Sequence, residues 1–217
     1  MSVRVEVWGE YACFSRPELK VERVSYDVMT PSAARGLLEA IYWHPGLRWC
    51  IDRIYVLRPI EFTNIRRNEV KSKIPASNVR SAMNGVKVPL YICTSDDIQQ
   101  RAAMVLKNVR YVIEAHFEMT SSAAQGDNPG KFCDIMKRRL EKGQCYHQPC
   151  FGCREFPANF RRWGGGEIVT AYPDKDIDLG LMLYDMDFSD KENISPMFFQ
   201  AKLLKGVLDL RNCEVLR

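Results

Sequence analysis

The sequence contains no long apolar run, and no stretch of about 18 apolar residues occurs anywhere in its 217 residues. We therefore expect no membrane-spanning helix, because such a helix needs about 20 predominantly apolar residues. The first residues are charged and alternating, and they lack the apolar core of a secretory signal peptide. The absence of an export signal predicts a cytoplasmic protein whose eight cysteines are reduced thiols.

Several common catalytic and metal-binding signatures are also absent. The sequence has no HExxH, GxSxG or Walker pattern, which disfavours zincin, α/β-hydrolase and P-loop chemistry. It lacks the paired CxxC motifs of a zinc ribbon, although Cys145, Cys150 and Cys153 are spaced like part of a metal site. Structural zinc needs four ligands, so we predict free thiols and no cofactor, with a metal site at these cysteines as the alternative. Asp185 and Asp187 share one face of an expected strand, and we interpret them as solvated.

The sequence does contain enough apolar material for a core. Hydrophobic residues make up 46% of the chain, and 217 residues suit one domain or a domain with a smaller annex. The net charge is only +4, which is compatible with an anionic partner but is weak evidence for one.

Local patterns predict a succession of strands and helices. Thr30 is expected to cap a helix with Pro31 at its first position, and Asn128 and Pro129 repeat this pattern before a second helix that Gly143 ends. The expected order is strand 3–7, helix 31–44, strand 49–57, a basic segment 66–87, a segment 96–106 that suits helix or strand, a turn at 107–108, strand 109–119, helix 129–142, and short strands 167–172, 179–188 and 197–204.

This order predicts an α+β fold. Residues 1–145 are expected to form a ferredoxin-like (RRM-like) domain with a basic β insertion at about 62–93, and residues 146–217 a C-terminal antiparallel β-sheet annex. A fold of this kind supports many functions, so function has to be argued from individual side chains.

Positive charge is concentrated between residues 66 and 87. One acid, Glu69, opposes six basic residues, and six minus one gives +5: Arg66, Arg67, Lys71, Lys73, Arg80 and Lys87. We interpret the segment as an exposed basic hairpin or mobile loop, with Asn84–Gly85 as a hairpin-type turn. A solvated surface is the ordinary explanation of one such run. Further basic patches, with acids gathered at 174–190, favour a face that binds a polyanion.

Tyr42 and His116 are the candidate proton-transfer residues. Tyr42 lies at the end of the first helix, and His116 lies on the polar face of strand 109–119. Tyrosine and histidine can move the protons when a ribose 2′-hydroxyl attacks its own phosphate, provided a cation stabilises that phosphate. The alternative for Tyr42 is a core aromatic residue, and the alternative for His116 is an ordinary surface histidine.

Motifs spread over the first 156 residues resemble one known family. They are Val-Glu-Val-Trp-Gly-Glu-Tyr-Ala-Cys-Phe (5–14), Tyr-Asp-Val-Met-Thr-Pro-Ser-Ala-Ala-Arg-Gly (26–36), Glu-Ala-Ile-Tyr-Trp-His-Pro (39–45), Ile-Arg-Arg-Asn-Glu-Val (65–70), Glu-Ala-His-Phe (114–117) and Gly-Cys-Arg-Glu-Phe (152–156). Together they are similar to the CRISPR-associated Cas-five family, d (also c) subtype, and the C-terminal tail resembles it more loosely.

The resemblance implies a RAMP-type endoribonuclease of the type I-C Cascade system. Such a protein has a ferredoxin-like domain followed by a β-sheet region. It cuts precursor CRISPR RNA at the base of the repeat hairpin without a metal, and stays bound to the 5′ handle beside the other Cascade subunits. The family's catalytic tyrosine and histidine match Tyr42 and His116, and the product would carry a 2′,3′-cyclic phosphate. Some members have a lysine where this chain has Ala115.

The cation that stabilises the phosphate is therefore left open between Lys107, Arg110 and His44. The full set of predicted RNA-binding residues is Arg35, His44, Arg66, Arg67, Lys71, Lys73, Lys107 and Arg110. A non-catalytic crRNA-binding subunit of the same complex is the alternative, because binding needs the same basic side chains while Ala115 removes one cation from cleavage.

Overall fold

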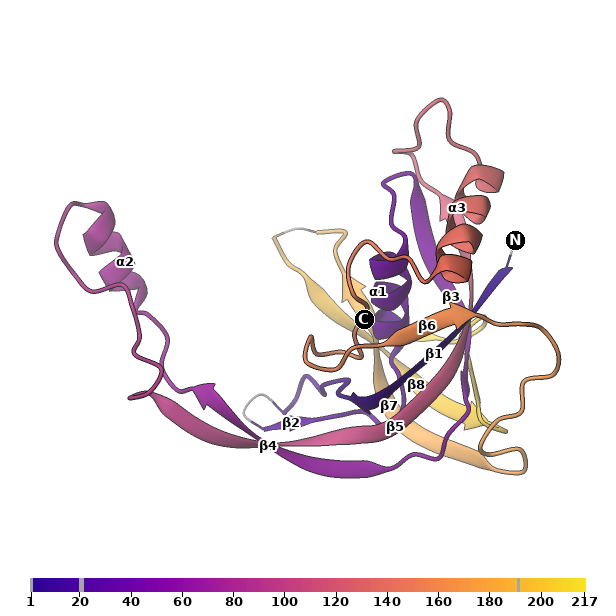
Figure 1. Ribbon diagram of the computed structural model, residues 1–217, viewed down its shortest axis with the longest axis horizontal. Coiled ribbons are helices and arrows are strands. Elements are labelled where there is room, and N and C mark those ends of the chain that lie inside the picture. Colours follow the sequence, from indigo (N-terminus) through magenta and orange to yellow (C-terminus); the bar gives the residue numbers. More distant parts are fainter. Residues whose placement is uncertain (1, 20–21, 191) are drawn as a thin grey trace.

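Antiparallel strands dominate the fold. The computed structural model describes residues 2–19, 22–190 and 192–217, and these form a mixed α/β chain (Figure 1). The strands are β1 (Ser2–Ala12), β2 (Arg23–Val24), β3 (Leu47–Val56), β4 (Phe62–Val70), β5 (Ile98–Met119), β6 (Asn159–Arg162), β7 (Asp176–Asp187), β8 (Ser195–Leu204), β9 (Val207–Asp209) and β10 (Val215–Leu216). They form one ten-stranded sheet in the order β10-β8-β9-β3-β5-β1-β6, with β2 and β4 also paired to β5 and β7 paired to β8.

The long strand β5 organises the sheet. Its C-terminal half pairs with β3 on one side and β1 on the other, while its N-terminal half pairs with β4. The predicted turn at 107–108 is wrong, because the strand continues through it with Asn108 at φ 52°. Asparagine tolerates this left-handed conformation better than most residues. The segment 96–106, which suited helix or strand, is strand from Ile98 onward.

Two helices, α1 (Pro31–Ile41) and α3 (Pro129–Lys142), pack on one face of the sheet. Both helices begin at the predicted signals, and α3 also ends at the predicted one, whereas α1 ends at Ile41, three residues before the predicted end. The side chains of Thr30 and Asn128 each accept a hydrogen bond from a backbone N–H of the first turn, and Gly143 ends α3 at φ 63°. Local capping chemistry therefore predicted the starts of both helices and the end of α3.

The hydrophobic core lies between these helices and the sheet. Phe132 of α3 packs edge-on against Phe117 of β5 with ring centroids 5.9 Å apart, and Phe117 packs against Trp49 of β3 at 5.6 Å. The same cluster buries the apolar stripe of α1: Ala34, Leu37, Leu38 and Ile41. Burial of each large apolar side chain contributes roughly 1.5–3 kcal/mol, so this layer fixes the end of α1 relative to β5.

The basic segment projects from the rest of the molecule (Figure 1). We call residues 66–101 the arm and the remaining described residues the body. The arm consists of the outer parts of β4 and β5 with helix α2 (Ala76–Met83) between them. The β4–β5 ladder pairs residues 62–70 with residues 98–106, so the second strand lies beyond the predicted basic segment 66–87, and the bounds of the insertion stay a prediction. The chain turns at Asn84–Gly85, but the predicted hairpin-type turn is wrong: Asn84 is the C-cap of α2 and Gly85 follows it at φ 83°.

The C-terminal strands join the same sheet. β6 pairs with β1 and β9 pairs with β3, so strands from both sides of residue 145 share it, and the division of the chain there stays a prediction. Strands 179–188 and 197–204 are confirmed as β7 and β8. The strand predicted at 167–172 is wrong: Thr170 Oγ1 donates to the Lys205 carbonyl and Ile60 N–H donates to the Tyr172 hydroxyl instead. None of the helices in the described ranges is long and apolar enough to cross a membrane.

Candidate active site

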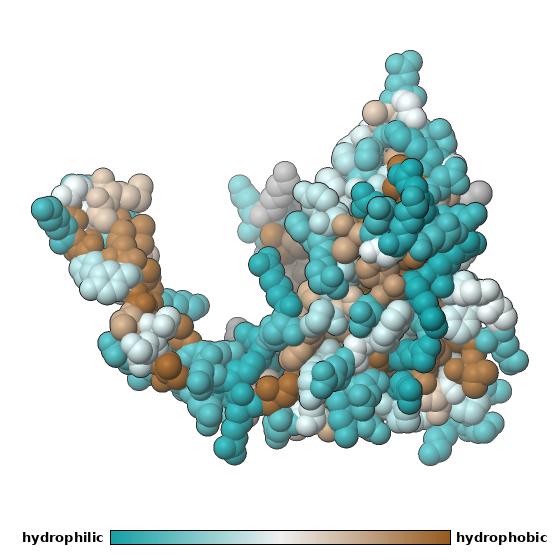
Figure 2. All heavy atoms as spheres, viewed as in Figure 1, coloured by the Kyte–Doolittle hydropathy of each residue, from teal (hydrophilic) through white to brown (hydrophobic). Residues whose placement is uncertain are grey.

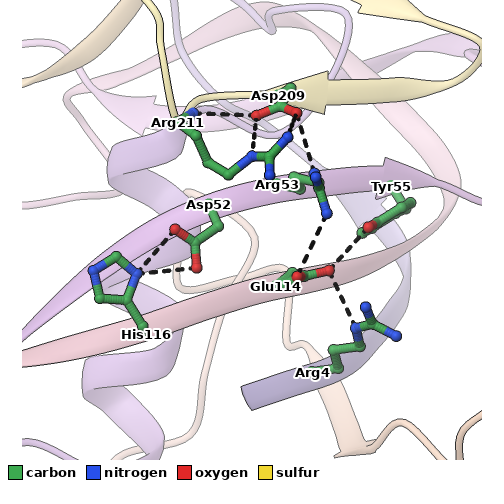
Figure 3. Close-up of polar contacts among 8 residues, drawn as sticks. All are labelled: Arg4, Asp52, Arg53, Tyr55, Glu114, His116, Asp209 and Arg211. Atoms are coloured by element: carbon green, nitrogen blue, oxygen red, sulfur yellow. Dashed lines mark hydrogen bonds and ion pairs between the residues drawn. The ribbon is translucent and has the colours of Figure 1, made fainter. Parts of the chain in front are cut away.

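His116 and Asp52 form a hydrogen-bonded pair on the polar face of the sheet (Figure 3). His116 Nδ1 lies 2.9 Å from Oδ1 and 3.0 Å from Oδ2 of Asp52, and the His116 side chain is 39% exposed. A carboxylate only accepts hydrogen bonds, so the proton on Nδ1 points to Asp52. Nε2, on the far side of the ring, keeps its lone pair in the neutral imidazole. A histidine held in this tautomer can act as a general base and, once protonated, as a general acid.

A β-bulge in β3 brings Asp52 to this face. The register of β3 against β5 shifts between Ile51 and Arg53, so that Arg53 faces Glu114. A bulge adds one residue to its strand, and as a result Asp52 and Arg53 both reach the polar face although they are adjacent in the sequence. Strict alternation along the strand does not anticipate this arrangement.

Glu114 lies two residues before His116 on β5 and gathers other polar side chains (Figure 3). Its carboxylate accepts hydrogen bonds from Arg4 Nε at 3.1 Å and from the Tyr55 hydroxyl at 2.9 Å, and Arg53 Nη1 lies 3.6 Å away. Glu114 is almost fully buried, and these partners offset the cost of burying its charge.

Arg53 also links this cluster to β9. Its Nε lies 3.1 Å from Asp209 Oδ2, and Asp209 makes a second ion pair with Arg211 at 2.6 Å. Hydrogen bonds from Arg211 hold the pKa of the Asp209 carboxyl well below its usual range, and Arg53 adds to this effect. Arg4 and Arg211 remain about half exposed. The polar face therefore carries an acid–base pair with guanidinium groups along the same strands, and guanidinium is well suited to hold a phosphate.

Tyr42 lies at the end of α1, which stops at Ile41 rather than at residue 44. Its carbonyl accepts a hydrogen bond from Trp49 Nε1 at 2.9 Å. Its ring packs edge-on against Phe132 with centroids 6.1 Å apart, and the Arg139 guanidinium lies 5.0 Å from the ring centroid. Tyr42 is only 5% exposed, and burial raises the pKa of its hydroxyl despite the nearby charge of Arg139.

Tyr42 and His116 lie on opposite faces of the sheet. Successive side chains of a strand point to opposite faces. Phe117 points to the helix-covered face, where it contacts Phe132, the ring that also packs against Tyr42. His116 therefore points the other way, toward Asp52. The structure does not bring the two predicted catalytic residues together, and their shared role stays a prediction.

His44 lies on the Tyr42 side. Its ring centroid is 4.9 Å from that of Phe132, and its Nδ1 accepts a hydrogen bond from Gly46 N–H at 3.0 Å. Asp127 Oδ2 lies 3.7 Å from the same nitrogen. His44 is thus on the wrong face to stabilise a phosphate held by His116, and this part of the cation prediction is not favoured by the geometry.

Residues 2–211 match the model of the Cas5d family, which is described as CRISPR-associated protein (Cas_Cas5). The chain belongs to this family. Two similar relatives, both named CRISPR pre-crRNA endoribonuclease Cas5d, extend the match. The one from Mannheimia succiniciproducens is 52% identical over 213 residues, which cover 96% of this chain and 94% of the relative. The one from Thermus thermophilus is 41% identical over 227 residues, which cover 96% and 90%.

Solved structures share the fold of this Cas5d family member. A crystal structure of a CRISPR-associated protein superposes with a TM-score of 0.72 at 22% identity, covering 100% of this chain and 97% of that one. A functionally uncharacterized protein from Streptococcus mutans gives 0.71 at 21% identity with the same coverage. A chain of a CRISPR RNA-guided surveillance complex gives 0.52 at 12% identity, covering 100% and 89%. At these identities the likeness concerns the fold alone.

Arg35, predicted to bind RNA, is neutralised inside the body of this Cas5d-type chain. Its guanidinium lies 2.8 Å from Asp185 of β7 and 2.8 Å from Glu39 of α1. The interpretation of Asp185 as solvated is therefore wrong, because this carboxylate joins α1 to β7. Asp187 also departs from that interpretation: its side chain is 19% exposed, and Arg217 lies 3.8 Å from it.

Lys107 and Arg110 are also paired. Lys107 Nζ lies 3.2 Å from Glu61 on the surface. Arg110 Nε donates to Glu6 at 2.7 Å, and Glu6, which is 1% exposed, also binds Arg161. These two arginines lower the pKa of Glu6 against the opposing effect of burial. Arg110 therefore stabilises the buried Glu6 carboxylate, in addition to any contact that it makes with RNA.

The arm holds the remaining predicted RNA contacts. Arg67 lies at its base, where it pairs with Glu155 of the body. Arg66, Lys71 and Lys73 are exposed, and within the described ranges no ion pair neutralises them. Their charge is therefore available to an anionic partner.

The cysteines expected as alternative metal ligands do not form a ligand group in the described part of the chain. None of Cys145, Cys150 and Cys153 forms a disulfide bond, and Cys153 lies beside Cys13 instead. The side chain of Cys13 and the guanidinium of Arg23, which donates to Cys153 Sγ at 3.7 Å, lower the pKa of Cys153 to about 6. The group that the fold does assemble is Cys50, His116 and Glu118, whose ligand atoms lie within 4.8 Å of one another. A soft cation bound there would occupy His116 itself.

Sequence reasoning missed several residues of the polar face. Asp52, Arg53, Arg4 and Arg211 carry no motif, and they meet His116 and Glu114 only through strand pairing and the bulge. One signal was available in the sequence. The alternating polar residues Arg110, Glu114, His116 and Glu118 indicate a polar face, and the charged side chains on such a face are expected to pair with side chains of the neighbouring strands.

Proposed function

We propose that this chain is a metal-independent endoribonuclease that cuts precursor CRISPR RNA at the repeat hairpin and keeps the 5′ handle bound within a type I-C Cascade complex. Two relatives that match nearly the whole chain carry the name of a pre-crRNA endoribonuclease. The observation that carries the proposal is the His116–Asp52 pair, which is a positioned proton-transfer group on an accessible face.

His116 begins the proposed reaction by removing the proton of the ribose 2′-hydroxyl through Nε2. The 2′-oxygen then bonds to the adjacent phosphorus, and the bond from phosphorus to the 5′-oxygen breaks. The leaving oxygen takes a proton, so the products are a 2′,3′-cyclic phosphate and a 5′-hydroxyl. Asp52 stabilises the imidazolium that forms, and Arg53 with Arg211 offers the positive charge that Ala115 does not supply.

Tyr42 is the proposed donor of the proton to the leaving oxygen. Because Tyr42 is buried on the helix-covered face, this role requires the segment 42–45 to turn toward His116 when RNA binds. Tyr42→Phe decides the matter, because the substitution keeps the packing ring and removes only the hydroxyl. Unchanged cleavage by this variant would make Tyr42 a core aromatic residue.

Cleavage of repeat RNA in EDTA, with analysis of the product ends, tests the reaction. Full activity with a 2′,3′-cyclic phosphate at the new 3′ end supports the mechanism. Loss of cleavage in EDTA, restored by a divalent cation, would contradict its metal independence.

The strand order also supports a ferredoxin-like unit in this chain. The succession β1-α1-β3-β5-α3-β6 forms an antiparallel sheet in the order β6-β1-β5-β3 with both helices on one face. This order is the one expected of a split βαβ arrangement with the arm inserted between β3 and β5.

A second candidate function is a crRNA-binding subunit that does not cut. The pairing of Arg4, Arg53 and Arg211 with acids favours it, since each is partly neutralised. Tight binding of repeat RNA without any cleavage product would select this candidate.

A further inference from the structure

A cavity of about 410 Å³ opens at the edge of the sheet beside the polar face. β6 pairs with the middle of β1, so in the described part of the chain no strand pairs with the first residues of β1 on that side. Trp163 follows β6 and donates its backbone N–H to the Arg4 carbonyl at 3.0 Å. Helix α3 contributes Lys137 and Leu140 to the lining.

The lining combines an apolar wall with cations and with the carboxylate of Glu114, which pairs with Arg4. Leu140 and Trp163 are apolar, while Arg4, Lys137 and Arg162 are basic. The Trp163 Nε1–H is buried and has no hydrogen-bond partner among the described residues. Such a donor normally finds a partner, because an unsatisfied buried polar group is costly.

The cavity adjoins the His116–Asp52 pair. Ser2, which lines the cavity, is the cross-strand partner of His116, and Arg4 is the partner of Glu114. Glu114 precedes His116 by two positions, which is about 7 Å along a strand. Figure 3 shows Arg4 and Glu114 on the same side of the sheet as His116. A chain with one phosphate at His116 would therefore reach the cavity with its neighbouring nucleotide.

We propose that this cavity binds a single nucleotide of the RNA beside the scissile phosphate, with its base against Trp163 and Leu140 and its phosphate near Arg4 and Lys137. The inference rests on the proposed ribonuclease function and adds residues that contact the base and the phosphate of one nucleotide of the substrate. The volume lies in the lower part of the range of about 300–1,000 Å³ typical of ligand sites, which suits one unstacked nucleotide. A free inorganic anion would leave the apolar wall uncovered, whereas proteins that bind single-stranded RNA stack bases on aromatic rings.

An abasic scan of the substrate tests this site. Repeat RNAs with one abasic ribose at each position around the cleavage site are cut by wild type and Trp163→Ala in single-turnover reactions. The affinity of each RNA is measured in parallel with a 2′-deoxy analogue that cannot be cut. At one position, loss of the base is expected to weaken binding or cleavage by wild type about 10-fold. Trp163→Ala is expected to lose a similar factor on intact RNA and nothing more on that abasic RNA.

Matched variants separate the contributions. Trp163→Phe keeps an aromatic ring with a smaller face for stacking, so a loss of about threefold is expected. Lys137 and Arg138 are exposed neighbours on α3, but only Lys137 lines the cavity. Lys137→Gln is expected to weaken binding, and Arg138→Gln is the control that does not. Thermal melting of each variant identifies any that fails to fold.

Two failures can be told apart. If wild type cuts repeat RNA but every abasic position affects wild type and Trp163→Ala equally, the nucleotide site is overturned and the proposed function stands. If wild type does not cut, the proposed function fails, and the affinity measurements still decide the site. The site is supported if, at one position, removing the base weakens binding by wild type but not by Trp163→Ala. It is overturned if the effects of base removal and of Trp163→Ala on affinity simply add at every position.

Discussion

The body and the arm bury their side chains to very different degrees. In the body, α1 and α3 bury their apolar stripes against the sheet. In the arm, α2 buries no residue, and Met83 and Tyr91 are 83% and 76% exposed. Figure 2 shows hydrophobic side chains along the outer part of the arm, away from the body. The arm is therefore held by its β4–β5 ladder, and a two-stranded hairpin alone has marginal stability.

Charge is distributed as unevenly as burial. Arg53 and Arg110 of the body are paired with acids, whereas Lys71 and Lys73 of the arm have no ion pair within the described ranges. We infer that the body holds the reacting groups in place and the arm supplies unneutralised charge for RNA. Substitutions in the two regions should then separate cleavage, stability and affinity.

The largest expected effect is on cleavage, from His116 in the body. His116→Ala is expected to slow single-turnover cleavage by ~10²–10⁴-fold, as is typical when a proton-transfer group is removed, with RNA affinity nearly unchanged. Asp52→Asn is expected to cause a smaller loss, because it weakens the hold on the imidazolium. His147→Ala, at an exposed histidine distant in sequence from the pair, is the control. An equal loss of affinity and cleavage in His116→Ala would mean that His116 only binds RNA.

The next effect is on stability, and it contrasts two apolar residues of similar size. Leu38 is fully buried in α1, so Leu38→Ala is expected to cost ~2–5 kcal/mol of unfolding free energy. Met83→Ala in the arm is expected to stay within about 0.5 kcal/mol of wild type, because Met83 is exposed. Denaturant unfolding measures both. A large loss from Met83→Ala would mean that the arm folds back on the body in solution.

Signals confined to a few neighbouring residues predicted the fold best. Thr30, Asn128 and Gly143 marked helix ends correctly because a cap involves only residues one turn away. The strand through Asn108 and the helix before Asn84–Gly85 were missed, because each dipeptide suits a turn and only pairing or helix formation around it decides otherwise.

The candidate site was predicted only in part, for a related reason. The alternation around His116 correctly placed it on a polar face, but Asp52 reaches that face through a bulge that no local pattern announces. The sequence placed Tyr42 correctly at a helix end. Which side of the sheet that end covers depends on the packing of Phe132 and Phe117, which come from distant segments.

A smaller effect is expected on affinity, from the arm. Lys71→Ala with Lys73→Ala should weaken RNA binding about 10-fold and lower the slope of log affinity against log salt by about 1.4, since each phosphate contact to a single strand contributes ~0.7. The melting temperature should not change, because both side chains are exposed. Lys175→Ala with Lys202→Ala removes two exposed lysines of the body and is the control. Equal losses from both pairs would show that only net charge matters.

The smallest effect is a pH dependence of stability at Asp209, which ties β9 to the polar face of the body. Its pKa is held well below the usual range, chiefly by Arg211 and also by Arg53. A carboxylate with a lowered folded-state pKa stabilises the protein above its unfolded pKa of about 3.9, and this contribution is lost as pH falls through that value toward the folded one. The side chain is 36% exposed, so solvent screening limits the effect to ~1 kcal/mol or less.

The measurement is the difference in unfolding free energy between wild type and Asp209→Asn across pH. The difference should be constant above about pH 5 and shrink steadily below about pH 4. Asp174→Asn, at an exposed acid of the same C-terminal region, controls for the loss of one negative charge. A difference that persists unchanged at low pH would mean that Asp209 acts through the hydrogen bond that its side chain accepts from the Arg211 backbone N–H rather than through its charge. In that case Arg53 would be freer to meet a phosphate than its ion pair implies.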